Sequence, residues 1–303
     1  MIQKVALIGA GAIGAYFIKE LDNNVTVIAQ GKRYEKLKSE GIYINDIHYD
    51  LHVSTPLEDE IFDLAIICTK YNGLDDAIDM LKEIMNENTI VLSPLNGVDS
   101  EEKIGSVVGM EHMVYSLMRI GSRREGNHIY FDDHKISDIY YGSLETNDRK
   151  LKELTDYFST TNVKFHCLDN ILSDMWTKYA SNIANNLPQA IVGLPSKMYF
   201  EGEHGRFIAD KLYQEVYLIA KAKGIDIPKK TIFFDSVPKV SKFSTLQDIE
   251  AKRHTEIDMF LGVLLKYGKQ YNITLPYSEY TYHLIKLLEE KNDGLFELNE
   301  NDY

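Results

Sequence analysis

The chain has 303 residues, which is enough for two domains with separate cores, and 44% of the residues are hydrophobic. A formal net charge of −13 argues against a general nucleic-acid or anionic-membrane surface. The two cysteines, Cys68 and Cys167, are too few for a disulfide framework, and no uncharged apolar run reaches the ~18 residues of a membrane span. We therefore expect a soluble, cytoplasmic protein without nucleic-acid or membrane partners.

The first 30 residues predict a strand, a glycine-rich turn, a helix and a second strand. Residues 5–8 are fully apolar, residues 15–21 have helical spacing, and residues 25–29 are again apolar and β-branched. Between the first strand and the helix lies a G-x-G-x-x-G pattern formed by Gly9, Ala10, Gly11, Ala12, Ile13 and Gly14. Such glycines permit a tight turn, a close approach of a pyrophosphate to the backbone, and close packing of the helix on the strand. The helix N-terminus would face the phosphates, so we predict a dinucleotide-binding domain, the alternative being a turn without a ligand.

The end of the second strand indicates which dinucleotide is bound. An NAD site usually has Asp or Glu there for the ribose 2′-OH, whereas this chain has Gln30 followed by Lys32 and Arg33. Two cations would attract a 2′-phosphate. We therefore predict NADPH, with Lys32 and Arg33 as cofactor residues. The alternative is a solvated helix start, in which Glu35 neutralises one of the two cations.

Two further apolar runs, residues 62–68 and 89–93, predict buried strands, and a helix is expected between them at 75–85. Lys70 follows the first run and Asn96 follows the second. Ligands of an open parallel sheet lie outside the carboxyl ends of its strands. We therefore expect Lys70 and Asn96 to face cofactor or substrate.

After about residue 100 the pattern weakens. The arginine pair Arg123 and Arg124 is expected to lie in a solvated hairpin loop rather than at a phosphate site. A first domain is expected to end at residue 168. Its remaining predicted elements are strands at 113–117, 129–131, 138–142 and 163–166, a hairpin loop at 122–127 and a helix at 151–158.

The second half, residues 169–303, predicts an all-helical domain, since strand-like alternation nearly disappears. Proline residues mark breaks between the expected helices. A cleft at the junction of two such domains is a common place for a ligand. The predicted helices span about 171–187, 203–224, 229–235, 245–271 and 277–290.

One face of the first of these helices is polar. Lys178, Asn182 and Asn186 lie four residues apart, so on a helix they fall within an arc of about 80°. A cation and two amides are unsuited to a core face, but they suit the wall of a site for a small polar anion.

A second polar string lies further along the chain. Ser244 is a suitable N-cap and Gln247 fits the N3 position of a capping box. Residues 254–258 place polar groups directly before an apolar run at 259–265. A plain solvated helix face, with Arg253 neutralised by nearby carboxylates, would explain the same residues. The nine histidines show no zinc-site spacing, and no metal is expected.

Together these strings resemble the ketopantoate reductases (2-dehydropantoate 2-reductases) over essentially the whole chain and in the same order. The glycine pattern is generic, but the lysine/asparagine helix and the string Arg-His-Thr-Glu-Ile-Asp at 253–258 are specific to that family. Two departures stand out: the family commonly has an arginine at about Gln30 or Gly31, and its usual Gln before Asn-Gly is Leu95 here.

The resemblance implies an N-terminal Rossmann domain and a helical C-terminal domain like that of phosphogluconate dehydrogenases. It implies NADPH-dependent reduction of a 2-keto acid, ketopantoate to pantoate, in pantothenate and coenzyme A biosynthesis. Lys178 would be the general acid and Glu256 its orienting partner. The implied substrate residues are Asn96, Asn182, Asn186 and Ser244, and Lys70 would serve the cofactor.

Hydride arriving at a ketone carbon builds negative charge on the oxygen, which an ammonium such as that of Lys178 stabilises before donating its proton. Two alternatives stay open. One is a reductase of a different 2-keto or imino acid on the same fold, and the other is a dinucleotide-binding sensor without turnover. The sequence also leaves a homodimer open.

Overall fold

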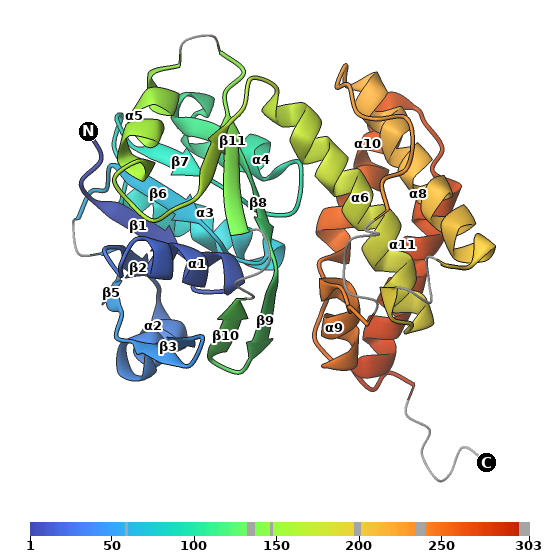
Figure 1. Cartoon of the computed structure of the whole chain (residues 1–303), viewed down its shortest axis with the longest axis horizontal. Coiled ribbons are helices and arrows are strands. Elements are labelled where there is room, and N and C mark those ends of the chain that lie inside the picture. The colour runs from blue at the N-terminus through green and yellow to red at the C-terminus, as the bar shows by residue number, and fades with distance from the viewer. Residues whose placement is uncertain (58–59, 132–136, 146–147, 197–200, 234–239, 297–303) are drawn as a thin grey trace. The chain divides into compact units, whose positions relative to one another are not determined.

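The structure is a computed structural model that describes residues 1–57, 60–131, 137–145, 148–196, 201–233 and 240–296 (Figure 1). The chain divides into two compact units, Met1–Ile171 and Leu172–Tyr303. A mixed α/β unit with a mainly parallel sheet is followed by a helical unit, as predicted for the fold. No helix within the described ranges is both long and apolar enough to cross a membrane.

Within its described residues the first unit has an eight-stranded sheet in the order β12-β11-β8-β7-β6-β1-β2-β5. The strands from β5 to β8 in this order are parallel, and β11 is antiparallel to β8. The chain leaves β1 toward β2 on one side and later continues through β6 on the other, so the strand order reverses beside β1. The strands are β1 (Val5–Ile8), β2 (Thr26–Ile28), β5 (His52–Ser54), β6 (Leu64–Ile67), β7 (Ile90–Leu92), β8 (Met113–Ile120), β11 (Ser137–Gly142) and β12 (Phe165–Cys167).

Helices cover both faces of this sheet, which explains why β1 and β6 are apolar at every position. Leu7 packs in a core with α1, α2 and α5, whereas its neighbour Ile8 packs in a second core with α3 and α4. Cys68 is buried in the first core, as expected. The helices are α1 (Ala12–Glu20), α2 (Gly31–Glu40), α3 (Leu74–Glu83), α4 (Ser100–Val108) and α5 (Arg149–Phe158).

A smaller sheet, in the order β4-β3-β10-β9, was only partly predicted. The prediction of a hairpin loop at 122–127 is wrong, because Ser122–Glu125 forms β9 and the turn occupies only 126–127. The run Ser-Arg-Arg-Glu has no apolar alternation, because β9 is an edge strand whose side chains make polar contacts. The other strands are β3 (Ile42–Ile44), β4 (Ile47–Tyr49) and β10 (His128–Phe131).

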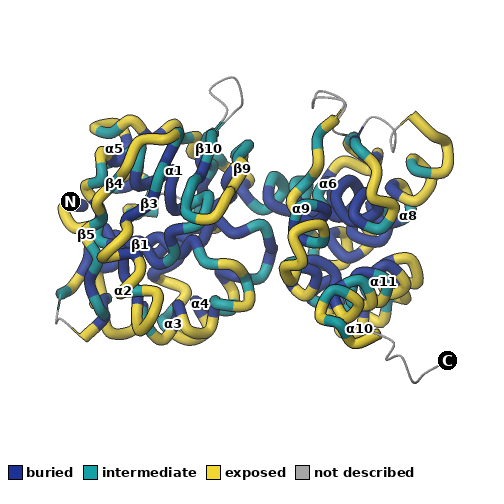
Figure 2. The backbone as a smooth tube through the Cα atoms, turned by 90° about the horizontal axis from the view of Figure 1, so that it is seen from below, coloured by how far each residue is buried: buried dark blue, intermediate teal, exposed yellow. Residues whose placement is uncertain are grey.

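The second unit is built around α6 (Ile171–Val192), which is buried over most of its length (Figure 2). This helix continues past the predicted end at 187 with Pro188 inside it. Residues 229–233 are not helical, contrary to prediction, and 234–235 lie outside the described residues. The other helices are α8 (Glu203–Ala222), α9 (Ser244–Glu250), α10 (Val263–Tyr271) and α11 (Pro276–Asn292).

The single helix predicted for 245–271 is wrong, because residues 251–256 leave the helix between α9 and a π-helical turn at Asp258–Gly262. Lys252 has a φ of 51°, and the N–H of Arg253 bonds back to the carbonyl of Asp248 at 2.8 Å. A left-handed residue followed by such a bond is a helix C-terminal motif, so α9 ends there. The Arg253 side chain pairs with the Asp248 carboxylate at 2.8 Å.

Candidate functional site

In the glycine turn after β1, the backbone of residues 9–14 packs closely against the backbone of Cys68 and Thr69. Gly9 has a φ of +108°, and a Cβ there would lie 2.7 Å from the backbone of Cys68 and Thr69. A Cβ on Gly14 would lie 2.1 Å from the Gly9 carbonyl oxygen. A Cβ on Gly11 would meet nothing nearer than the Cys68 carbonyl oxygen at 3.8 Å. Gly9 and Gly14 are therefore required by the fold, whereas Gly11 leaves open space at the turn.

The N-terminus of α1 fits an anionic group. Its N-cap residue is Gly11, no side chain caps it, and its first turn has no acidic residue. The first N–H groups of a helix have no partner within the helix and carry a partial positive charge. The backbone of Ala10, Ala12 and Ile13 lies at this turn, so the residues that are present fit a dinucleotide pyrophosphate.

The carboxyl edge of the sheet carries the other predicted residues of this unit. Lys70 is exposed two residues after Cys68, whose N–H bonds to the Ile8 carbonyl at 2.7 Å, so it lies beside the glycine turn. Asn96 is half-buried after β7. Along the same edge Thr69 Oγ1 and Ser93 Oγ are buried without a hydrogen-bond partner among the described residues. Buried hydroxyls without partners are uncommon and mark a place that a ligand or water would complete.

The cations after β2 lie on the first turn of α2, and Arg33 Nη2 donates to the Ala10 carbonyl at 3.4 Å. Arg33 therefore reaches the glycine turn. Within the described residues neither Lys32 nor Arg33 pairs with Glu35. Desolvation, followed by the positive charge of Arg124, lowers the pKa of Arg33 below its ordinary value.

Glu101, in the first turn of α4, is a buried acidic residue that sequence reasoning missed. It is 1% exposed, and its carboxylate accepts hydrogen bonds from Ser100 Oγ at 2.9 Å and from the Ser116 N–H at 3.3 Å. Burial raises its pKa to about 8, so the carboxyl group is largely protonated at neutral pH. A pair of adjacent glutamates at a helix start resembles a solvated first turn, so the sequence offered no signal.

In the second unit α6 presents the predicted polar face. Lys178 and Asn182 are half-buried, and Asn186 is 6% exposed. Asn186 Oδ1 is buried and has no hydrogen-bond partner in the described part of the chain. By contrast, the Asn185 amide donates to the carbonyl oxygens of Ser181 at 2.6 Å and Ile232 at 2.9 Å. Asn185 therefore serves the fold, whereas Asn186 keeps a buried acceptor that no described residue satisfies.

The C-terminal part of α6 fixes the segment that leads to Ser244. The buried Gln189 donates from Nε2 to the Ser241 carbonyl at 3.0 Å and accepts from the Phe243 N–H at 2.8 Å. Ser244 is exposed and begins α9, but the predicted cap is wrong, because Phe243 occupies the N-cap and no side-chain cap bond forms. The Gln247 side chain instead donates to the Lys242 carbonyl at 2.7 Å.

The N-terminal part of α6 fixes the segment that carries Glu256. The Tyr179 hydroxyl donates to the Phe260 carbonyl and lies 3.5 Å from the Met259 carbonyl. Glu256 is half-buried directly before the helical stretch that starts at Ile257, and its carbonyl accepts from the Phe260 N–H at 3.0 Å. Tyr179 adjoins Lys178, so one helix carries the predicted acid and anchors the segment of its predicted partner.

Two residues that hold these segments, Gln189 and Glu289, were not predicted. Glu289 on α11 is 3% exposed and bonds to Thr255, the neighbour of Glu256. The signal for Gln189 was a long amide in an otherwise apolar stretch of α6, three residues after Asn186. Glu289 has no comparable signal, because its partner lies 34 residues away.

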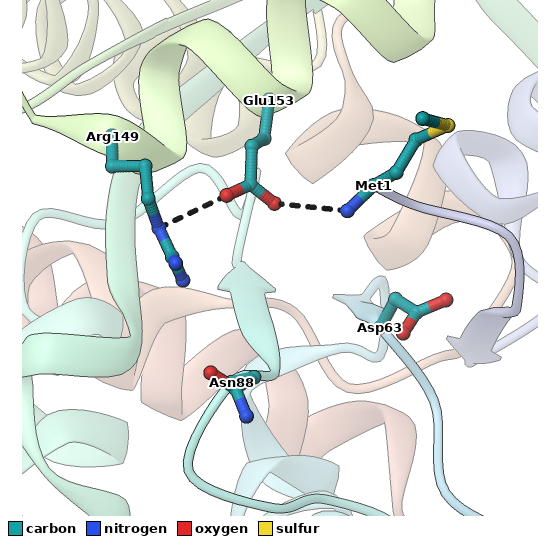
Figure 3. A pocket seen from close by; sticks show the side chains of 5 residues that line it. All are labelled: Met1, Asp63, Asn88, Arg149 and Glu153. Atoms are coloured by element: carbon teal, nitrogen blue, oxygen red, sulfur yellow. Dashed lines mark ion pairs between the residues drawn. The ribbon is translucent and has the colours of Figure 1, made fainter.

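A cavity of about 150 Å³ lies away from these residues (Figure 3). It is lined by Met1, Asp63, Asn88, Arg149 and Glu153, and Glu153 pairs with the Met1 amino group at 3.6 Å and with Arg149 Nε at 3.0 Å. Asp63 and Asn88 precede β6 and β7, so the cavity lies at the amino edge of the sheet. Ligands of such sheets bind at the opposite edge.

Comparison with known proteins gives consistent matches along the chain. Residues 5–146 match the family model "Ketopantoate reductase PanE/ApbA", and residues 170–289 match "Ketopantoate reductase PanE/ApbA C terminal". A 2-dehydropantoate 2-reductase of Pyrococcus abyssi is 25% identical over 298 residues, covering 94% of this chain and 97% of that protein.

Solved structures share the fold. D-mandelate dehydrogenase in ternary complex with NADH and anilino(oxo)acetate superposes with a TM-score of 0.86 at 22% identity, covering 96% of this chain and 99% of that one. A dimeric ketopantoate reductase from Staphylococcus aureus gives a TM-score of 0.79 at 19% identity, covering 95% and 99%. The two family models together span most of the chain, and the chain is therefore an oxidoreductase that belongs to the ketopantoate reductase family.

Proposed function

We propose that this protein reduces ketopantoate to pantoate with NADPH, and that Lys178 is its general acid. The observation that carries the proposal is the polar face of α6, with Lys178, Asn182 and Asn186 four residues apart on a helix that also anchors the Glu256 segment. A site that only bound a dinucleotide would not need these groups. The family relationship supports a reductase.

The roles of the residues follow from their chemistry. When bound, a reduced nicotinamide supplies hydride to the ketone carbon. The Lys178 ammonium stabilises the negative charge that develops on the ketone oxygen and donates a proton to it. Glu256 orients the ammonium from its position directly before a helical stretch.

The buried acceptor of Asn186 supports a hydroxylated substrate. Ketopantoate has a hydroxyl group in addition to its keto and carboxylate groups. A hydroxyl that donates to Asn186 Oδ1 would satisfy an atom that has no other partner in the described residues. Asn182, Asn96 and Ser244 would donate to the carboxylate or hydroxyl without adding charge.

On the cofactor side, the backbone at residues 9–14 would bind the pyrophosphate. Lys70 would contact the cofactor from the neighbouring strand end, and Lys32 and Arg33 would bind the 2′-phosphate. The contact of Arg33 with the Ala10 carbonyl and the absence of a pairing with Glu35 in the described residues support NADPH over NADH. A homodimer is part of the proposal, supported by the dimeric S. aureus relative.

The test is to follow NADPH absorbance with ketopantoate and with 2-ketoisovalerate, which lacks only the hydroxymethyl group. A site built around the substrate hydroxyl should prefer ketopantoate by at least about 10²-fold in kcat/KM. Equal rates would remove the argument from Asn186. No oxidation with any 2-keto acid of a panel would contradict the proposed activity.

A second candidate is the reduction of an aromatic 2-keto acid. It is favoured by the likeness to D-mandelate dehydrogenase, which was solved with anilino(oxo)acetate. Benzoylformate belongs in the same panel for this reason. Faster turnover of benzoylformate than of ketopantoate would favour this candidate.

A further inference from the structure

The side chains of Arg123 and Arg124, which are adjacent on β9, lie on opposite faces of the small sheet. Arg123 lies over the ring of Tyr130, 4.7 Å from its centroid, and its Nη1 is 2.5 Å from Glu125 Oε1. Successive side chains of a strand point to opposite faces. Arg124 therefore lies on the other face of the sheet, and the sequence expectation that treated the two arginines alike does not hold.

The register defines the face on which Arg124 lies. Arg124 pairs with Ile129 across the strands, and Ile129 pairs with Ile44. Both isoleucines are 1% exposed and belong to the core that includes α1 and the start of the glycine turn. Directly opposed residues share a face. Arg124 is thus on the side of the sheet that faces the dinucleotide-binding elements, and β9 itself packs against α1 (Figure 1).

Arg33 approaches the same place from α2, since its Nη2 contacts the Ala10 carbonyl at 3.4 Å. The strand register and the packing of β9 against α1 place Arg124 on this side of the sheet, and desolvation, followed by the positive charge of Arg124, lowers the pKa of Arg33, in agreement with that placement. Arg124 Nε donates to the Gly126 carbonyl at 2.9 Å, which ties its side chain to the turn of its own hairpin.

No carboxylate of the described residues neutralises these two charges. Among the described residues neither Arg33 nor Arg124 pairs with a carboxylate, and the nearby Glu125 pairs with Arg123. Two unneutralised guanidinium groups beside one turn repel each other. A dianion between them would relieve this repulsion and could form charge-assisted bonds with both.

We propose that Arg124 on β9 and Arg33 on α2 together bind the 2′-phosphate of the NADPH adenosine ribose. This proposal rests on the proposed use of NADPH. It makes the small sheet, which lies outside the βαβ unit, part of the cofactor-specificity site.

The experiment measures binding of 2′,5′-ADP and of 5′-AMP by titration calorimetry, so that catalysis is not required. In the wild type, 2′,5′-ADP should bind more tightly than 5′-AMP. Arg124→Gln should weaken the binding of 2′,5′-ADP by about 10-fold or more, as expected for a lost charge-assisted bond. The affinity for 5′-AMP should stay unchanged. Arg124→Lys should retain part of the affinity.

Arg123→Gln is the matched control, one residue away on the opposite face, and should bind both ligands as the wild type does. Equal loss of 2′,5′-ADP binding in Arg123→Gln and Arg124→Gln would overturn the site and leave only a general charge effect. Unchanged binding in Arg124→Gln, with a wild type that prefers 2′,5′-ADP, would overturn the role of Arg124 and leave NADPH in place. A wild type without that preference would overturn the use of NADPH itself.

Discussion

The buried carboxylate of Glu289 accepts two hydrogen bonds from Thr255, one from its N–H at 2.7 Å and one from its Oγ1 at 2.6 Å. Lys286 Nζ lies 3.1 Å from the same carboxylate. Thr255 also accepts from the Ile257 N–H at 3.2 Å, so the backbone on both sides of Glu256 is fixed. A residue on α11 thereby holds the segment of the proposed catalytic glutamate.

Glu289→Gln should therefore lower both stability in neutral solution and kcat. Burial opposes ionisation of Glu289, but the bonds from Thr255 and Lys286 outweigh it and its pKa is lowered. A lowered acid pKa gives stability that is present above the unfolded value of about 4.3 and is lost as the pH falls through the folded value. We expect the difference in Tm between wild type and variant to be largest near pH 7 and to shrink below about pH 4. A difference independent of pH would contradict this account.

The contribution of Glu101 to stability should depend on pH in the opposite direction to that of Glu289. Its pKa of about 8 in the folded protein lies above the ordinary value, so its contribution to stability is fully present at low pH and is lost between about pH 4 and 8. Glu101→Gln mimics the protonated form and should flatten the fall in Tm across this range. The Tm of the two proteins from pH 5 to 9 tests this, and parallel curves would contradict it.

Lys178→Met removes the proposed proton donor while keeping a long apolar side chain on α6. We expect kcat to fall by about 10² or more, with NADPH affinity nearly intact. Single-turnover kinetics and NADPH fluorescence titration separate the two quantities. Full activity in this variant would exclude Lys178 as the acid.

Asn186→Ala removes the buried acceptor and should reduce the preference for ketopantoate over 2-ketoisovalerate. Most of the at least about 10²-fold discrimination should disappear through loss of kcat/KM for ketopantoate. Asn185→Ala is the control, since its amide bonds to carbonyls at 2.6 and 2.9 Å and serves the fold. That variant should lose stability but keep the preference, and the reverse pattern would exchange the two roles.

Gly11→Ala and Gly14→Ala distinguish the glycine that leaves room for a ligand from the glycine that the fold requires. A Cβ at Gly14 would lie 2.1 Å from the Gly9 carbonyl oxygen, so this variant should lose about 1–3 kcal/mol of stability. A Cβ at Gly11 would meet only an atom at 3.8 Å, so Gly11→Ala should fold normally. Denaturant unfolding and 5′-AMP titration should show normal stability with weaker binding for Gly11→Ala, and strong binding there would refute the backbone approach at this position.

Local patterns made much of this molecule predictable. The β1 run, the glycine spacing and the polar face of α6 are each encoded within about 15 neighbouring residues, and the periods of strand and helix are fixed by backbone geometry. The path of residues 253–256 after the end of α9 is different, because it is fixed by the bonds from Thr255 to a residue 34 positions away. The same holds for Arg124, whose surroundings come from the pairing of β9 with β10 and of β10 with β3.

The positions of the anchoring residues and of the proposed ligand residues on α6 have a consequence for the tolerance of this chain to insertions and deletions. Between Lys178 and Gln189, the side chains proposed to bind the ligand are interspersed with side chains that serve the fold, and each residue turns the helix by about 100°. A single residue inserted after Asn182 would move Asn185 into the surroundings of Asn186, turn Asn186 away from them by about 100°, and move Gln189 off its bonds to Ser241 and Phe243. Substrate range in such a protein can therefore change through substitutions or through loop length elsewhere, whereas the length of this stretch of α6 is fixed.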